Sequence, residues 1–226
     1  MLEGGQAMLF STRNSDFESE KERNLYYKFF AGYFFNELIP DLDARIGSFC
    51  TLLNDCTRGG KSIRPGVRLT PDSTHVSFDN HGYLFSGIGL DRGEFADVLI
   101  QDHSTRVMVA IEAKVQSNWS YNKDIASNEK RLKLIENEIP NLTMFPCLLL
   151  TESKWKASAR QKSRQHSNYQ RLVESDGCRT RVVFWEELLA ITNDIKVRAY
   201  IEDQLARSHR SRYAFEGGWF KQGLPN

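Results

Sequence analysis

The sequence predicts an α/β fold in one domain, with a central mixed β-sheet flanked by α-helices. Three observations lead to this fold class. Apolar residues recur at helical spacing near the N-terminus, short apolar runs follow in the middle of the chain, and strand-like and helix-like segments alternate in the second half. No Pro-rich or Ser-rich linker divides these segments, and 226 residues are enough to bury a sizeable core.

The first elements are two helices and four strands. Aromatic residues repeat every three or four positions over 17–38 and apolar residues do so over 42–53, and Pro40 separates the two helical patterns. Polar turns then divide two pairs of apolar runs, which predicts two hairpin-like strand pairs. The predicted strands span 75–78, 83–88, 95–101 and 106–115.

The later elements alternate between helix and strand. Pro140 and Gly177 follow two of the helical patterns, as expected where a helix ends. The run 144–150 is almost wholly apolar, which is typical of a strand in the middle of a sheet. In chain order we expect a helix over 122–139, a strand over 144–150, a basic helix over 156–175, a strand over 181–185 and a helix over 186–207. Residues 16–208 form the expected domain, and 1–15 and 209–226 are expected to be tails.

The composition excludes several classes of protein. A hydrophobic fraction of 40% and a net charge of +1 are unlike those of a disordered chain. No apolar stretch is long enough to span a membrane, and the N-terminus lacks the pattern of a secretory signal. The four cysteines form no C-x-x-C pair, and the five histidines lack zinc-site spacing. We therefore expect a cytoplasmic protein with reduced thiols and no membrane partner.

The predicted strands at 95–101 and 106–115 carry charges that are unusual inside a sheet. Side chains alternate between the faces of a strand, so Glu112 and Lys114 project from the same face, next to apolar neighbours. Asp97 lies on the preceding strand, and the short turn makes the two strands antiparallel neighbours. Two converging carboxylates beside a lysine suit a hard divalent cation such as Mg²⁺. The alternative is a buried ion pair between Glu112 and Lys114, with Asp97 near a turn.

The pattern of Asp97 followed by Glu112-Ala113-Lys114 resembles the PD-(D/E)XK nuclease superfamily, which has the restriction-endonuclease-like fold. The first acid of the family motif matches Asp97, and its E-x-K matches residues 112–114. Ala96 stands where the family usually has proline. The resemblance covers residues 97–114 and the general order of elements from about 17 to 190.

The resemblance implies a Mg²⁺-dependent endonuclease that hydrolyses DNA, with Mn²⁺ as a possible substitute. Asp97, Glu112 and the carbonyl of Ala113 hold the metal in this reading. Lys114 orients or deprotonates the attacking water and stabilises charge on the phosphate. A homodimer is required to cut both strands at once, because one chain offers one site.

Two further residues are weaker candidates for the site. Gln116 continues the face of Glu112 and Lys114, and it is either a contact to the phosphate or a polar strand end. Many family members add a glutamate from the first helix, and Glu22 continues the aromatic spacing backwards better than Glu18, Glu20 or Glu37. A solvent-facing role remains the alternative for all four glutamates.

Two basic segments suggest contacts to a nucleic-acid backbone. Six basic and no acidic residues lie between Ser153 and Val173, where Trp155 and Tyr169 are interleaved. A second group lies in the Gly- and Pro-containing loop 57–68. The predicted contacts are Arg58, Lys61, Arg64, Arg68, Lys154, Lys156, Arg160, Lys162 and Arg164. An ordinary solvated surface is the alternative for both segments.

Two other functions stay open at this stage. One is a catalytically inactive nucleic-acid-binding or assembly module that keeps the nuclease-like fold. The other is a different metal-dependent phosphate enzyme or an unrelated α/β protein, which would keep the carboxylates of Asp97 and Glu112 apart.

Overall fold

The computed structural model describes most of the region predicted as a domain. The described residues are 26–27, 29–31, 33–34, 41–62, 66–78, 96–115, 117–192, 195, 198–199, 201–203 and 205–206. The predicted strand over 83–88, both tails, Glu22, Arg64 and Gln116 lie outside them.

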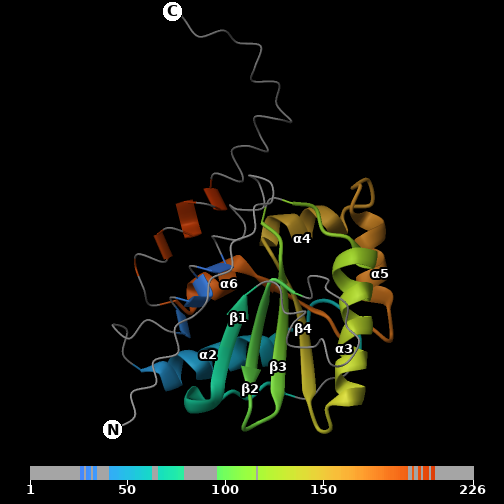
Figure 1. Cartoon of the computed structure of the whole chain (residues 1–226). Coiled ribbons are helices and arrows are strands. Elements are labelled where there is room, and N and C mark those ends of the chain that lie inside the picture. The colour runs from blue at the N-terminus through green and yellow to red at the C-terminus, as the bar shows by residue number, and fades with distance from the viewer. Residues whose placement is uncertain are drawn as a thin grey trace, which may run out of the picture.

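A five-stranded mixed sheet forms the centre of the protein, with strand order β1-β2-β3-β4-β5 (Figure 1). The first three strands are antiparallel neighbours, and β4 and β5 continue the sheet parallel to β3. The strands are β1 (Thr74–Phe78), β2 (Val98–Asp102), β3 (Val107–Ala113), β4 (Thr143–Leu150) and β5 (Arg181–Phe184). The predicted α/β class with a mixed sheet is therefore confirmed.

Helices cover both faces of this sheet (Figure 1). On one face, aromatic residues from the helical residues between 26 and 34 pack with α2 and α6 against alternate residues of β2 to β5. On the other face, α3, α5 and the chain between β3 and α3 complete two smaller clusters. The longer helices are α2 (Leu42–Asp55), α3 (Ser127–Glu138), α4 (Glu152–Ala159), α5 (His166–Glu174) and α6 (Trp185–Ala190). No helix among the described residues has both the length and the apolar character needed to cross a membrane.

The alternation predicted for β3 is confirmed. Val107, Val109, Ile111 and Ala113 belong to the larger core cluster on the α2 side. Met108 and Ala110 belong to the cluster that contains α3. Glu112 therefore projects from the α3 face of the sheet, as does Ala110 two residues earlier.

Three predicted helices differ from the structure. The helix expected over 186–207 is interrupted, because α6 ends at Ala190. The basic helix expected over 156–175 is divided into α4 and α5 by a turn in which Ser163 N–H donates to Arg160 O at 2.8 Å. Ser163 Oγ also accepts from Gln165 N–H at 3.1 Å, so a serine bonds to the local backbone in place of continuing the helix. The helix expected over 122–139 begins as the π-helical turn η4 (Tyr121–Ala126) before it continues as α3.

The loop 57–68 contributes a backbone ladder to the edge of β5. Val182 N–H donates to Arg58 O at 3.0 Å, Gly60 N–H to Thr180 O at 2.9 Å, and Ser62 N–H to Cys178 O at 3.1 Å. Gly59 has a φ of 108°, a conformation that side-chain-bearing residues rarely adopt. A Cβ on Gly60 would lie 2.1 Å from Cys178 O, so only glycine permits this approach.

Replacing Gly60 with alanine is expected to destabilise the protein by about 3 kcal/mol, because the added methyl group must push the two backbones apart. Urea denaturation measures the change in the free energy of unfolding. Gly177→Ala is the matched control, since a Cβ there meets nothing within 4 Å. Equal stabilities of the two variants would show that the ladder along β5 does not need a glycine.

A second polar anchor closes the turn between β2 and β3. Asp102 is only 2% exposed, and its carboxylate is the common acceptor for donors from three segments. Oδ1 accepts from Ser73 Oγ at 2.9 Å, Ser104 N–H at 2.9 Å and Thr105 N–H at 2.8 Å, and Oδ2 accepts from the Thr70 hydroxyl at 2.8 Å and the Thr70 N–H. Asp102 thus fixes β1, η1 (Pro71–Ser73) and the turn to one another.

Candidate metal centre

Asp97 and Glu112 face each other across two antiparallel strands. Val98 pairs with Ile111, so the register places Asp97, one residue earlier, opposite Glu112. Asp97 N–H donates to Ile111 O at 2.9 Å, which extends the ladder to this position. The strand pairing and its turn therefore bring these two acids to the same end of the sheet, as the sequence predicted.

The carboxylate of Asp97 is tied to the strand that carries the other candidates. Its Oδ2 accepts from Ala113 N–H at 2.6 Å. This hydrogen bond holds the Asp97 side chain against the end of β3, at Ala113, the residue between Glu112 and Lys114. The local backbone of Glu112-Ala113-Lys114 thus holds the first acid in place.

Lys114 lies between two carboxylates. Its Nζ is 2.6 Å from Glu112 Oε1 and 3.7 Å from Asp124 Oδ1, and all three side chains are less than one-fifth exposed. Lys114 N–H donates to Leu149 O at 2.9 Å, which anchors its backbone to β4. The ion pair that was the alternative interpretation of Glu112 and Lys114 is present, and it lies beside Asp97.

The sequence did not reveal the residues that η4 and α3 contribute. Asp124, Asn128 and Arg131 recur at spacings of four and three, and Asn128 is buried on α3 together with Leu132 and Ile135. Asn128 Nδ2 donates to Glu112 Oε2 at 3.5 Å and to Asp124 O at 3.1 Å. This polar stripe was a detectable signal, but its position over Glu112 depends on tertiary packing.

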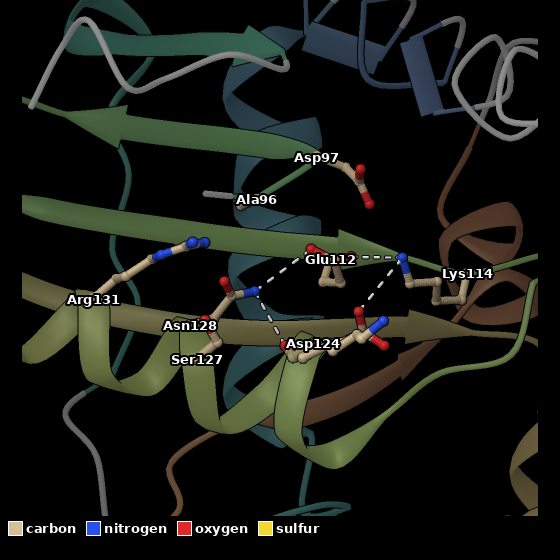
Figure 2. A pocket seen from close by; sticks show the side chains of 9 residues that line it. Ala96, Asp97, Glu112, Lys114, Asp124, Ser127, Asn128 and Arg131 are labelled. Carbon is tan, nitrogen blue, oxygen red and sulfur yellow. Dashed lines mark hydrogen bonds and ion pairs between the residues drawn. The ribbon is translucent and has the colours of Figure 1, made fainter. Parts of the chain in front are cut away.

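Together these side chains line a pocket of about 340 Å³ (Figure 2). One wall comes from the strands and the other from η4 and α3, and Figure 2 shows Arg131 and Lys114 toward opposite ends of it. The lining residues are Ala96, Asp97, Glu112, Lys114, Lys123, Asp124, Ser127, Asn128 and Arg131.

The charges around Lys114 shift the pKa values of the pair. Burial raises the pKa of Glu112, and Lys114 does not cancel this effect because Asp124 adds a second negative charge nearby. Burial alone would lower the pKa of Lys114, but Glu112, Asp97 and Asp124 outweigh it and hold that pKa above its usual range. The shift of Glu112 follows mainly from burial and that of Lys114 from the three carboxylates around it, so Lys114 is protonated in this arrangement.

The donor set fits Mg²⁺ better than a metal that needs a full protein shell. Within the described ranges, no three or more His, Cys, Asp or Glu side chains are placed to hold a metal ion together. Mg²⁺ is commonly held by one or two protein carboxylates, with water and substrate phosphate completing its shell. Asp97 and Glu112 supply that number, and the backbone of Ala113 lies between them.

The basic residues of the second half of the chain fall into two groups. Lys154 is only 5% exposed and its ammonium donates to Ser117 O, so it is an interior residue that cannot contact a nucleic-acid backbone in this arrangement. The other predicted contacts of this segment, Lys156, Arg160, Lys162 and Arg164, are exposed. Because α4 follows the carboxyl end of β4, it lies at the end of the sheet where Glu112 and Lys114 lie (Figure 1).

The described residues of the loop, 57–62 and 66–68, do not line the pocket. The side chain of Arg58 pairs with Glu187, and its guanidinium lies 4.1 Å from the centre of the Phe184 ring. Lys61 is exposed and lies 3.6 Å from Asp176. The carbonyl of Arg68 accepts from Thr105 at the β2–β3 turn, which is the opposite end of β3 from Glu112.

Three comparisons with known proteins yield no similarity. No protein-family model, no curated protein and no solved structure matches this chain.

Proposed function

We propose that this protein is a Mg²⁺-dependent nuclease that hydrolyses DNA phosphodiester bonds, with the restriction-endonuclease-like fold that its motif implies. The observation that carries the proposal is the convergence of Asp97, Glu112 and Lys114 in one pocket, from two strands in the required register. The order of helices and strands supports the same fold. Restriction, repair and anti-phage defence are the settings in which such an activity belongs.

The residues of the pocket divide the work between them. Asp97 and Glu112, with the carbonyl of Ala113, hold the cation, and Mn²⁺ serves as its substitute. When bound, the metal lowers the pKa of water and neutralises charge that develops on the phosphate. Lys114, as an ammonium, orients the attacking water and stabilises the negative charge on the scissile phosphodiester.

The exposed basic residues of the α4–α5 connection support contact with DNA. Lys156, Arg160, Lys162 and Arg164 are exposed, and α4 follows the end of the sheet that carries Glu112, so cations there would neutralise backbone phosphates. A homodimer would supply a second site for the opposite strand of a duplex.

One observation favours a second candidate, a nucleic-acid-binding or assembly module without turnover. Glu112 is already paired with Lys114, and no protein set of three ligands exists among the described residues. A module of this kind would retain the pocket as a structural ion-pair cluster. Only a measurement of cleavage separates the two candidates.

The test of the nuclease proposal is a cleavage panel with single- and double-stranded DNA and RNA, in Mg²⁺, Mn²⁺ or EDTA. We expect metal-dependent cleavage of DNA, and a loss of about 100-fold or more in Asp97→Asn, because the amide removes a charged ligand. Asn still offers Oδ1 to Ala113 N–H, so the local backbone keeps its hydrogen bond. Thermal unfolding checks that the variant is folded.

Asp72→Asn is the matched control, because Asp72 is an exposed aspartate in η1, outside the pocket. Cleavage by Asp97→Asn at the wild-type rate would exclude the proposed site. Absence of cleavage of every substrate by the wild-type protein, with both metals, would favour the binding module instead.

A further inference from the structure

A third carboxylate in the pocket has no place in the motif that suggested the nuclease. Asp124 comes from η4, ten residues after Lys114 in the chain, and its side chain is 14% exposed. Its Oδ1 lies 3.7 Å from Lys114 Nζ, which also contacts Glu112 (Figure 2). Burying another acid beside Asp97 and Glu112 raises the electrostatic cost of the site, so it requires an explanation.

The backbone around Asp124 fixes its carboxylate firmly. Asp124 Oδ2 accepts from Ser120 N–H at 2.6 Å, and Asp124 N–H donates to Ser120 O at 2.9 Å. Asn128 Nδ2 donates to Asp124 O at 3.1 Å. Isolated π-helical turns are rare in proteins and often occur at functional sites. The turn η4 carries Asp124 and leads into α3, which carries Asn128.

Helices α4 and α5 hold the segment that leads into this turn. Lys154 donates to Ser117 O, and Trp119 Nε1 donates to Ser158 Oγ at 3.2 Å. Asn168 Nδ2 donates to Trp119 O at 3.2 Å, and Asn168 Oδ1 accepts from Tyr121 N–H at 3.1 Å. Contacts to α4 and α5 therefore help to set the position of Asp124, whereas Lys114 immediately follows β3.

This arrangement gives Lys114 two different anchors. Glu112 is on the same strand as Lys114 and is a proposed ligand of the cation. When Glu112 binds a cation, its carboxylate no longer pairs with Lys114. The lysine then loses its nearest partner, and its long side chain can adopt many other rotamers. Asp124 remains as a second negative charge within 3.7 Å of the ammonium, held by its own backbone contacts.

We propose that Asp124 is the positioning residue of Lys114, which keeps the ammonium in the pocket when Glu112 binds the cation. The inference rests on the proposed nuclease function and assigns to this chain a fourth functional side chain outside the Asp97–Glu112–Lys114 motif. Asp124 acts through Lys114 and touches neither the cation nor the scissile phosphate.

The first test separates kcat from KM. In Asp124→Asn we expect kcat for DNA cleavage to fall about 10- to 100-fold, while KM and the half-saturating Mg²⁺ concentration change less than about twofold. Asn still accepts from Ser120 N–H, so η4 keeps its shape. Asp124→Glu restores the charge, and its kcat is expected to exceed that of Asp124→Asn. Glu138→Gln is the matched control, an exposed carboxylate-to-amide change on α3 that leaves kcat unchanged.

The second test does not depend on cleavage. Asp124→Asn, Lys114→Met and the double variant form a thermodynamic cycle, read as shifts of the urea midpoint. We expect the double variant to shift the midpoint by less than the sum of the single shifts, because each single change already removes the contact.

The outcomes separate this inference from the proposed function. Additive midpoint shifts overturn the positioning role, and so does an unchanged kcat in Asp124→Asn. A weakened Mg²⁺ requirement with unchanged kcat would make Asp124 a metal ligand and would also overturn it. If the wild-type protein cleaves no substrate, the nuclease proposal fails, and the cycle still decides whether Asp124 holds Lys114.

Discussion

Replacing Lys114 with methionine is expected to lower the rate of metal-dependent DNA cleavage about 1,000-fold. The ammonium is the pocket's nearest positive charge to Glu112, and it is the group proposed to stabilise charge on the phosphate. Removing a single preorganised donor of this kind costs about 100- to 1,000-fold in kcat, and loss of water orientation adds to it. Methionine keeps most of the aliphatic stem, so the packing around β3 changes little.

The measurement is a single-turnover cleavage assay in Mg²⁺, with thermal unfolding to confirm the fold. Lys133→Met is the matched control, since Lys133 is exposed on α3 outside this pocket. Loss of the ammonium leaves Glu112 and Asp124 facing each other, so the variant is also expected to be less stable than the control. A folded Lys114→Met protein with activity within about threefold of wild type would remove Lys114 from the mechanism.

The second large effect is on stability and concerns Asp102. Changing it to alanine is expected to destabilise the protein by about 4 kcal/mol, because several partly buried donors lose the acceptor that they share, and an unsatisfied buried donor costs about 1–3 kcal/mol. Donors on Thr70, Ser73, Ser104 and Thr105 lose their shared partner at once. The free energy of unfolding in urea is the measurement, and Asp72→Ala, an exposed change in η1, should alter it by less than about 0.5 kcal/mol.

The stability that Asp102 contributes is expected to depend on pH. Burial would raise the pKa of Asp102, but hydrogen bonds from Thr105, Ser104 and Thr70 outweigh burial and hold the pKa well below its usual range. A carboxyl whose folded pKa is depressed contributes its full stability above about pH 5 and loses it as the pH falls below about 4. Asp102→Ala should therefore flatten the acid side of the stability profile. An unchanged acid slope would contradict this role for Asp102.

Much of the sheet was predictable because its signals are local. The two-residue period of β3 placed Glu112 on one face and Ile111 on the other, and both placements are confirmed. A short polar turn was enough to pair β2 with β3 and to bring Asp97 opposite Glu112. The sequence therefore located the centre of the candidate site to within a few residues.

The rest of the site depends on contacts that composition and spacing do not encode. Lys154 counted as one of six cations in a basic segment, yet its partner is a backbone carbonyl on another segment, and it is buried. Arg58 counted as a phosphate contact, and its partner Glu187 is far away in the sequence. Asp124 was missed because its place beside Glu112 and Lys114 depends on how η4 and α3 pack against the sheet.

The backbone ladder formed by residues 58–62 also bears on how copies of this protein associate. An unpaired strand edge is a template for another chain, and open edges promote unwanted association between molecules. Along the outer edge of β5, Thr180 O already accepts from Gly60 N–H, and Val182 N–H already donates to Arg58 O. Two copies therefore cannot join their sheets through these positions, and a homodimer of the kind proposed would need another surface. The two glycines that fit the ladder against β5 therefore limit the ways in which the protein can assemble.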